Sequence, residues 1–439
     1  MHKALSLLLA LMMLLPRAAL GESAPSALSI FQALQDEDYA AVYAQFDETM
    51  QKTMSLAVLA TLLPQLEALG GTYTGYDREE TAQQEGYTLT ILHLLYEKSG
   101  FAFRVSWRDG KITGLFVRPE ALPSPLDPAV LPEGLAEEAV SFGSPALPGT
   151  LTWPQDGPSP MPAVVLLHGS GPNDRDETVG QTKLFRDLAW GLAERGVAVL
   201  RYDKRTLVYG AEMTAEELAH FTIREESLKD AAAAARFLAA DPRIDPRRIY
   251  LVGHSLGAMA APRAAEENPG LFAGLTLLAG TPRTLADLII SQNQALIDAL
   301  PALIRPAQQA RLDALCREWG IILAGSGEEA IGKTAFGQPA YYLWEMAQQD
   351  TADTLAHLDL PVLIVNGGQD FQVSDENGIE AWQEVKLPEN VEIRYYPELN
   401  HVLMAPNTPE TLRYTAAEYE IPCLVDERII SDIAQFIYR

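Results

Sequence analysis

The most informative stretch of this chain is residues 249–261, which read Ile-Tyr-Leu-Val-Gly-His-Ser-Leu-Gly-Ala-Met-Ala-Ala. Four apolar residues predict a strand, the following Gly-His-Ser-Leu-Gly motif predicts a tight turn, and the alanine-rich continuation predicts a helix. Such a turn, called a nucleophile elbow, lifts a serine hydroxyl above the end of a sheet, and Gly253 and Gly257 let the chain pass closely. We therefore expect Ser255 to be a nucleophile and its neighbour His254 to be structural.

Other apolar runs predict the sheet to which this strand belongs. They alternate with helical segments at 182–195 and 223–240, and fully apolar runs are typical of strands that are covered on both faces. A final helix is expected near 425–438. The pattern predicts the α/β class, with a doubly wound and mostly parallel sheet. The expected strands lie at 149–153, 163–167, 197–201, 248–252, 275–278, 361–365 and 391–396.

The strand-helix rhythm stops at about residue 280 and resumes at the strand 361–365. The interval of about 284–358 is helical in character, and we expect it to form a cap inserted into the sheet domain. Its apolar residues, among them Ile289, Leu296 and Tyr342, suit a hydrophobic pocket, although most of them are expected to pack the cap itself.

A separate module is predicted before the sheet domain. Residues 25–119 read as helices followed by strands, which indicates a small α+β domain. Within it, Asp109-Gly110 stands between two strand-like segments and predicts a hairpin. Residues 120–134 are rich in proline and predict an interdomain linker, so the sheet domain is expected over 135–439.

The first residues predict export from the cytoplasm. A short basic start is followed by an apolar run too short to span a bilayer, and Ala19 and Gly21 fit a cleavage site. We expect a signal peptide over 1–21, a mature chain that begins near Glu22, and a secreted or extracytoplasmic protein with no membrane association after cleavage. A retained anchor is the alternative.

The charge and the cysteines exclude several classes of partner. A formal net charge of −26 disfavours nucleic acid and anionic membrane surfaces, since both need a basic face. Cys316 and Cys423 are too few for a disulfide framework or a zinc site, and whether they pair is left open. We expect neither a metal nor a cofactor.

Chain order selects the partners of Ser255. In a sheet of this kind the serine is followed by an acid and then by a histidine, and only His357 and His401 follow Ser255. His357 precedes the strand that should carry the acid, so His401 is the expected base. Asp370 follows that strand directly and is the expected acid. Its rivals Asp375 and Glu376 resemble the start of the next helix.

An oxyanion formed during acyl transfer needs preorganised N–H donors. One is expected to be the backbone N–H of Leu256. The second should come from the loop that follows the strand 163–167, where we assign the N–H of Ser170, with that of Gly171 as the alternative. His168, in the same loop, is expected to support the loop rather than to react.

Three stretches resemble those of bacterial esterases of the α/β-hydrolase superfamily that are related to dienelactone hydrolases and serine aminopeptidase-like hydrolases. They are His168–Glu177, Arg201–Arg205 and Gly253–Gly257. The resemblance implies an α/β-hydrolase fold, an exported carboxylesterase, and an N-terminal domain of unknown function similar to cystatin or NTF2-like modules. Members usually have a glycine where this chain has Thr206, so that loop is expected to differ. Asp203 and Arg205 are expected to serve in structural ion pairing.

These features together predict a serine hydrolase that cleaves carboxylic esters through an acyl-enzyme. Its substrate would be a small-molecule or acylated-glycan ester. An aminopeptidase or a thioesterase would use the same triad, and acidic cap residues could bind a free amine. A non-catalytic glycan- or peptide-binding protein is a further hypothesis.

Overall fold

The computed structural model describes residues 26–84, 86–120, 130–300, 302, 304–406 and 416–439. The predicted signal peptide and most of the predicted linker lie outside these residues. The chain divides into two compact units, Met1–Glu120 and Ala121–Arg439, which are described separately.

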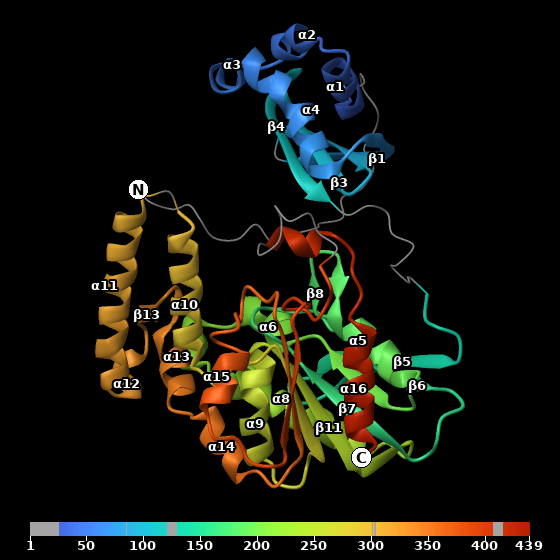
Figure 1. Cartoon of the computed structure of the whole chain (residues 1–439), viewed down its shortest axis with the longest axis vertical. Helices are drawn as coiled ribbons and strands as arrows, with labels where there is room; N and C mark the ends of the chain where they lie inside the picture. The colour runs from blue at the N-terminus through green and yellow to red at the C-terminus, as the bar shows by residue number, and fades with distance from the viewer. Residues whose placement is uncertain (1–25, 85, 121–129, 301, 303, 407–415) are drawn as a thin grey trace. The chain divides into compact units, whose positions relative to one another are not determined.

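In its described residues, the first unit contains four helices followed by an antiparallel four-stranded sheet in the order β1-β2-β3-β4 (Figure 1). Asp109 and Gly110 both have positive φ, 49° and 71°, and join the last two strands, which confirms the predicted hairpin. The helices and strands of this unit bury a shared apolar core. The elements are α1 (Ala27–Gln35), α2 (Tyr39–Ala44), α3 (Glu48–Thr53), α4 (Leu56–Gly70), β1 (Tyr73–Gln84), β2 (Tyr87–Tyr96), β3 (Gly100–Arg108) and β4 (Lys111–Glu120).

The second unit is built on an eight-stranded sheet in the order β16-β15-β12-β11-β7-β10-β6-β5. The strands from β16 to β10 are parallel, and β6 and β5 continue the sheet as antiparallel strands. This arrangement confirms the predicted fold class. Strand β5 was not predicted. The strands are β5 (Leu135–Phe142), β6 (Leu147–Pro154), β7 (Met161–Leu167), β10 (Ala198–Tyr202), β11 (Ile244–His254), β12 (Gly274–Leu278), β15 (Val362–Gly367) and β16 (Val391–Tyr396).

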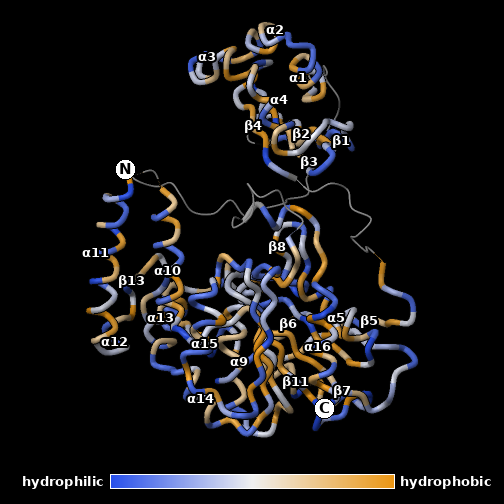
Figure 2. The backbone as a smooth tube through the Cα atoms, in the orientation of Figure 1, coloured by the Kyte–Doolittle hydropathy of each residue, from blue (hydrophilic) through white to orange (hydrophobic). Residues whose placement is uncertain are grey.

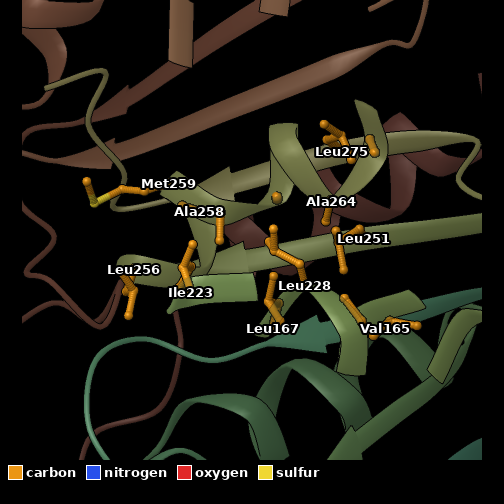
Figure 3. Packing of buried hydrophobic residues seen from close by; sticks show 14 of the residues in the cluster. Val165, Leu167, Ile223, Leu228, Leu251, Leu256, Ala258, Met259, Ala264 and Leu275 are labelled. Atoms are coloured by element: carbon orange, nitrogen blue, oxygen red, sulfur yellow. The ribbon is translucent and has the colours of Figure 1, made fainter. Parts of the chain in front are cut away.

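Helices cover both faces of this sheet. On β7, Val165 and Leu167 face one core and Val164 and Leu166 face the other, because successive side chains of a strand point to opposite faces. Figure 3 shows Val165 of β7 among residues of the first core, and Figure 2 shows the hydrophobic residues gathered along the strands. Helices α8 (Lys229–Ala239) and α9 (Leu256–Glu266) belong to the first core, and α5 (Leu184–Ala193) and α16 (Glu427–Ile437) belong to the second.

The segment between β12 and β15 is mostly helical, as predicted, but two very short strands interrupt it. Gln294 and Gln309 exchange side-chain hydrogen bonds and join its two long helices, α10 and α11. A second group of short helices follows β10 and was not predicted as a unit. The elements of the first segment are α10 (Leu285–Asp298), α11 (Arg305–Ala324), α12 (Gly327–Ala330), β13 (Thr334–Ala335), β14 (Gln338–Pro339), α13 (Ala340–Ala347) and α14 (Thr351–His357). Those after β10 are α6 (Arg205–Tyr209), η1 (Gly210–Glu212), α7 (Ala215–His220) and the π-helical turn η2 (Arg224–Leu228).

The described residues contain neither a membrane-spanning helix nor a disulfide. In the described part of the chain, no helix combines the length and the apolar character that crossing a membrane would need. Cys316 and Cys423 are both free, so no disulfide joins them. The remaining elements are β8 (Thr178–Val179), β9 (Thr182–Lys183), α15 (Ile379–Glu384) and η4 (Ala416–Glu420).

Candidate active site

Ser255 occupies a strained turn between β11 and α9. Its φ of 53° and ψ of −116° lie in a region that non-glycine residues rarely adopt, and its backbone N–H donates to Leu278 O at 2.9 Å. The two glycines of the motif are required by close backbone contacts. A Cβ atom on Gly257 would lie 2.0 Å from Leu167 O, and one on Gly253 would lie 2.3 Å from Gly257 O. The sequence therefore folds locally as a nucleophile elbow.

Asp370 and His401 meet at the ends of two neighbouring parallel strands. Asp370 follows β15 and His401 follows β16, and both side chains are buried. The distance from Asp370 Oδ2 to His401 Nδ1 is 2.7 Å. The other oxygen of Asp370 accepts the backbone N–H groups of Gln372 and Val373, each at 2.8 Å. The carboxylate is thus held from both sides and directed at the imidazole.

The rival residues are bonded to other groups. The carboxylate of Asp375 accepts the hydroxyl of Tyr395 at 2.9 Å and has no hydrogen bond to His401. His357 is exposed on α14, where its Nδ1 is 2.8 Å from Asp353 O. The structure pairs His401 with Asp370, whereas Asp375 and His357 have other partners.

Ser255 and His401 both line one cavity of about 810 Å³. Ser255 and His401 both belong to the described part of the chain, and the hydroxyl of Ser255 forms no hydrogen bond with the ring of His401. Contacts of this kind are often loose in an unliganded enzyme and tighten when substrate binds. Ser255 and His401, the predicted nucleophile and base, therefore line the same cavity.

The loop after β7 passes directly beside the serine. A Cβ atom on Gly169 would lie 3.2 Å from the Cβ of Ser255. The N–H of Gly169 donates to Glu177 Oε1 at 2.6 Å, so this group is already engaged. Ser170 and Gly171 line the cavity, and Leu256 is the first residue of α9, a position at which the backbone N–H has no partner within a helix. These are the donors expected to form the oxyanion hole.

His168 supports this loop from a buried position. Its ring is buried, burial lowers its pKa to about 4, and its Nε2 is 3.1 Å from Asp174 O. A neutral imidazole that donates to a carbonyl oxygen holds the turn in place, in agreement with the expected supporting role.

His254 and Glu177 form a buried ion pair that sequence reasoning missed. Nδ1 of His254 lies 3.2 Å from Glu177 Oε1, and its Nε2 lies 2.9 Å from His401 O. Burial lowers the pKa of His254, but the carboxylate of Glu177, with the carbonyl oxygen of His401 and the carboxylate of Asp370, raises it, and the pKa lies above its ordinary value. Burial raises the pKa of Glu177, but His254, with His168 and the N–H of Gly169, lowers it, and the pKa lies below its ordinary value. A charged pair therefore links the loop after β7 to the backbone of His401.

Asp203 and Arg205 are both in ion pairs, but not with each other. Asp203 pairs with Arg175 at 2.7 Å, and Arg205 pairs with Asp230 at 2.5 Å. The first pair holds the loop after β7 against β10, and the second holds α6 against α8. The expected structural role thus falls to two pairs instead of one.

The cavity wall is largely apolar. Two carboxylates line it, Glu177 and Glu226. Oε1 of Glu177 faces His254 and accepts the N–H of Gly169, and its Oε2 has no hydrogen-bond partner among the described residues. Glu226 accepts Lys204 Nζ and the hydroxyl of Tyr342, each at 2.6 Å. Among the predicted cap residues, Ile289 and Tyr342 line the cavity, whereas Leu296 is 69% exposed and does not. The apolar lining residues are Pro172, Val179, Met213, Leu218, Phe221, Leu256, Met259, Leu285, Leu288, Ile289, Pro339, Val373 and Val402.

Comparisons with known proteins show the family to which this chain belongs. Residues 164–412 match the alpha/beta hydrolase family, and residues 27–115 match a family described as a protein of unknown function (DUF3887). Esterase EstD of Thermotoga maritima is 31% identical over 420 residues, which cover 93% of each chain. A pimeloyl-[acyl-carrier protein] methyl ester esterase of Methylococcus capsulatus is 57% identical over 42 residues, 10% of this chain and 16% of that one. Among solved structures, Est1E from Butyrivibrio proteoclasticus is 17% identical, with a TM-score of 0.42 and coverage of 69% of this chain and 99% of that chain.

Proposed function

Because this chain belongs to the alpha/beta hydrolase family, we propose that it is a carboxylesterase that works through Ser255, His401 and Asp370. The observation that carries the proposal is the 2.7 Å contact of Asp370 with His401, which lines the same cavity as Ser255. The esterase name of the relative that matches 93% of the chain supports the choice of substrate bond.

The reaction would proceed in two halves. Ser255 Oγ attacks the ester carbonyl while His401 Nε2 accepts the serine proton, and the Asp370 carboxylate stabilises the resulting imidazolium. The N–H groups of Leu256 and Ser170 hold the tetrahedral oxyanion. His401 then returns the proton to the leaving alcohol, and an acyl-enzyme remains. Water then attacks the carbonyl of the acyl-enzyme, with His401 as the base, and the carboxylic acid and the free serine are released.

The cavity favours a neutral acyl group over a free amine. An aminopeptidase must bind the ammonium group of its substrate with an unpaired carboxylate, and both carboxylates of the described cavity wall are paired. An apolar chamber of about 810 Å³ fits an acyl chain of small or medium length. The helices α10 and α13 contribute lining residues, and we propose that the segment from α10 to α14 acts as a cap that selects the acyl group.

Two further proposals concern the N-terminal part of the chain. We propose that residues 1–21 are a signal peptide and that the protein acts outside the cytoplasm, which N-terminal sequencing of protein recovered from a secreting host would test. The helices and sheet within residues 27–120 would then form an accessory domain of the exported enzyme.

The test of the proposed activity compares the wild-type protein with Ser255→Ala. Both would be incubated with p-nitrophenyl esters whose acyl group ranges from acetyl to laurate, and with aminoacyl p-nitroanilides. We expect the wild type to hydrolyse the esters and Ser255→Ala to lose about 10⁶ of kcat. Equal turnover by the two proteins would end the catalytic proposal. Faster cleavage of the anilides than of the esters would favour the aminopeptidase.

A further inference from the structure

Lys204 is a buried cation that the proposed reaction does not use. It follows β10, and its residue is only 1% exposed. Its Nζ lies 2.6 Å from Glu226 Oε1 and donates to the carbonyl oxygen of Gly169 at 2.6 Å. A charge in such a place is costly unless it is paired and hydrogen-bonded, and both partners here are specific. One of them belongs to the loop that passes beside Ser255.

The contact with Gly169 O determines where a neighbouring N–H points. The carbonyl of Gly169 and the N–H of Ser170 belong to the same peptide unit, and in a trans peptide these two groups point in opposite directions. Lys204 holds the oxygen from the buried side. The N–H of Ser170 is therefore directed away from Lys204, and Ser170 itself is exposed and lines the cavity.

Other contacts hold the flanking groups of the same loop. Glu177 accepts the N–H of Gly169 at 2.6 Å, and Asn173 Nδ2 donates to the carbonyl oxygens of Gly169 and Ser170 at 3.1 and 3.2 Å. The backbone groups that flank the Ser170 N–H are therefore all hydrogen-bonded: the N–H and the carbonyl of Gly169 on one side, and the carbonyl of Ser170 on the other. A charged donor on the carbonyl also polarises the peptide and makes its N–H a better donor.

We propose that Lys204 is a positioning residue that aligns the Gly169–Ser170 peptide, so that the Ser170 N–H becomes the second donor of the oxyanion hole. This inference rests on the proposed esterase function. It also selects Ser170 over Gly171, a choice that the sequence left open.

The same network reaches the helical segment over the cavity. Glu226, which neutralises Lys204, lies in the π-helical turn η2 and accepts the hydroxyl of Tyr342 from α13 at 2.6 Å. π-helical turns inside helices are frequent at functional sites. Tyr342 therefore holds Glu226, Glu226 holds the ammonium group of Lys204, and Lys204 holds the carbonyl of Gly169 in the loop after β7.

The test uses the full chain with Lys204→Met and Glu226→Gln combined, because the single lysine change would leave Glu226 buried and unpaired. The measured quantities are kcat and KM for p-nitrophenyl butyrate per active site, titrated from the burst, and the affinity for a trifluoromethyl ketone that forms a tetrahedral adduct. Loss of one oxyanion donor costs about 100- to 1000-fold in kcat, and misalignment should cost about 30-fold. We expect that loss in kcat, a parallel loss of ketone affinity, and a KM within about threefold.

The matched control is Arg205→Met combined with Asp230→Asn. This change removes a buried ion pair that starts one residue further along the chain and has no hydrogen bond to the loop 168–171. We expect it to lower the melting temperature without changing kcat per titrated site. A merely structural role of Lys204 would reduce the number of active sites but not the kcat of each one.

Two results would overturn the inference: an unchanged kcat per site in the Lys204→Met, Glu226→Gln protein, or an equal loss in the control. Should the double variant not fold, Asn173→Ala replaces it, because this residue holds the same carbonyl oxygen from the cavity side. We expect about a tenfold loss of kcat there, with parallel loss of ketone affinity, and an unchanged kcat would again overturn it. If the wild type and Ser255→Ala hydrolyse the ester equally, the proposed function has failed instead.

Discussion

Replacing Asp370 by asparagine tests the orientation of His401 with almost no change of volume. One oxygen of Asp370 accepts two backbone N–H groups, and the other faces His401 Nδ1. If the new amide oxygen faced the histidine, its NH₂ group would meet those two donors, and each lost hydrogen bond costs about 1–3 kcal/mol. The amide oxygen should therefore keep the backbone donors, and the NH₂ group should donate to Nδ1.

That arrangement places the proton of a neutral His401 on Nε2, where it cannot accept the serine proton. The corresponding change in a serine protease triad lowers kcat by about 10⁴, which is about 5 kcal/mol of transition-state stabilisation. We expect a loss of the same order for Asp370→Asn, with little change in the free energy of unfolding, since the hydrogen bonds are retained.

The assay is the initial rate of p-nitrophenyl butyrate hydrolysis at neutral pH, with urea unfolding of the same preparation. Asp375→Asn is the matched control, because this carboxylate lies in the same loop but is bonded to Tyr395. We expect its kcat to stay within about twofold of the wild type. A loss below about tenfold for Asp370→Asn, in a folded protein, would refute Asp370 as the group that orients His401.

Two further predictions concern stability. Since the pKa of His254 lies above its ordinary 6.5 and that of Glu177 below its ordinary 4.5, the pair stabilises the fold fully between about pH 4.5 and 6.5. This contribution is lost as the pH rises through the folded pKa of His254 or falls through that of Glu177. The melting temperatures of the wild type and Glu177→Gln should therefore differ most near pH 6 and converge as the pH rises through the folded pKa of His254, and a constant difference would contradict the charged pair. Gly257→Ala would place a methyl group 2.0 Å from Leu167 O and should destabilise the protein by about 3 kcal/mol in urea unfolding. Gly320→Ala, in the exposed part of α11 with open space around it, should be neutral or stabilising, and equal effects of the two changes would argue against the close contact.

Some features of this protein follow from local sequence. The Gly-His-Ser-Leu-Gly motif predicts the elbow because its spacing and its flanking apolar runs depend only on neighbouring residues. The apolar strands predict a sheet covered on both faces, and β7 bears this out with side chains in two separate cores. Chain order then singled out His401 and Asp370, and the structure places their side chains in contact.

Other features could not be predicted, for identifiable reasons. Strand β5 lacks an apolar run, since it is an edge strand with Glu137 and Glu138 exposed or half-exposed, so its periodicity is weak. The two-residue strands β13 and β14 are too short for any pattern to emerge. The fine structure of the segment between β12 and β15 was therefore predicted only as helical.

The charged pairs behind the site are a matter of tertiary structure. Glu177 and His254 are 77 positions apart, and Lys204 lies between them in the chain. In the fold, Glu177 and Lys204 are both bonded to Gly169, which lies beside Ser255, and His254 pairs with Glu177. The local sequence around a buried lysine or glutamate does not predict its ion-pair partner. The partner depends on which strand ends the sheet topology brings together. Local patterning thus predicted the nucleophile, and chain order predicted its partners. Only the packed fold decided which N–H groups face the cavity, since their direction depends on contacts between residues distant in the chain.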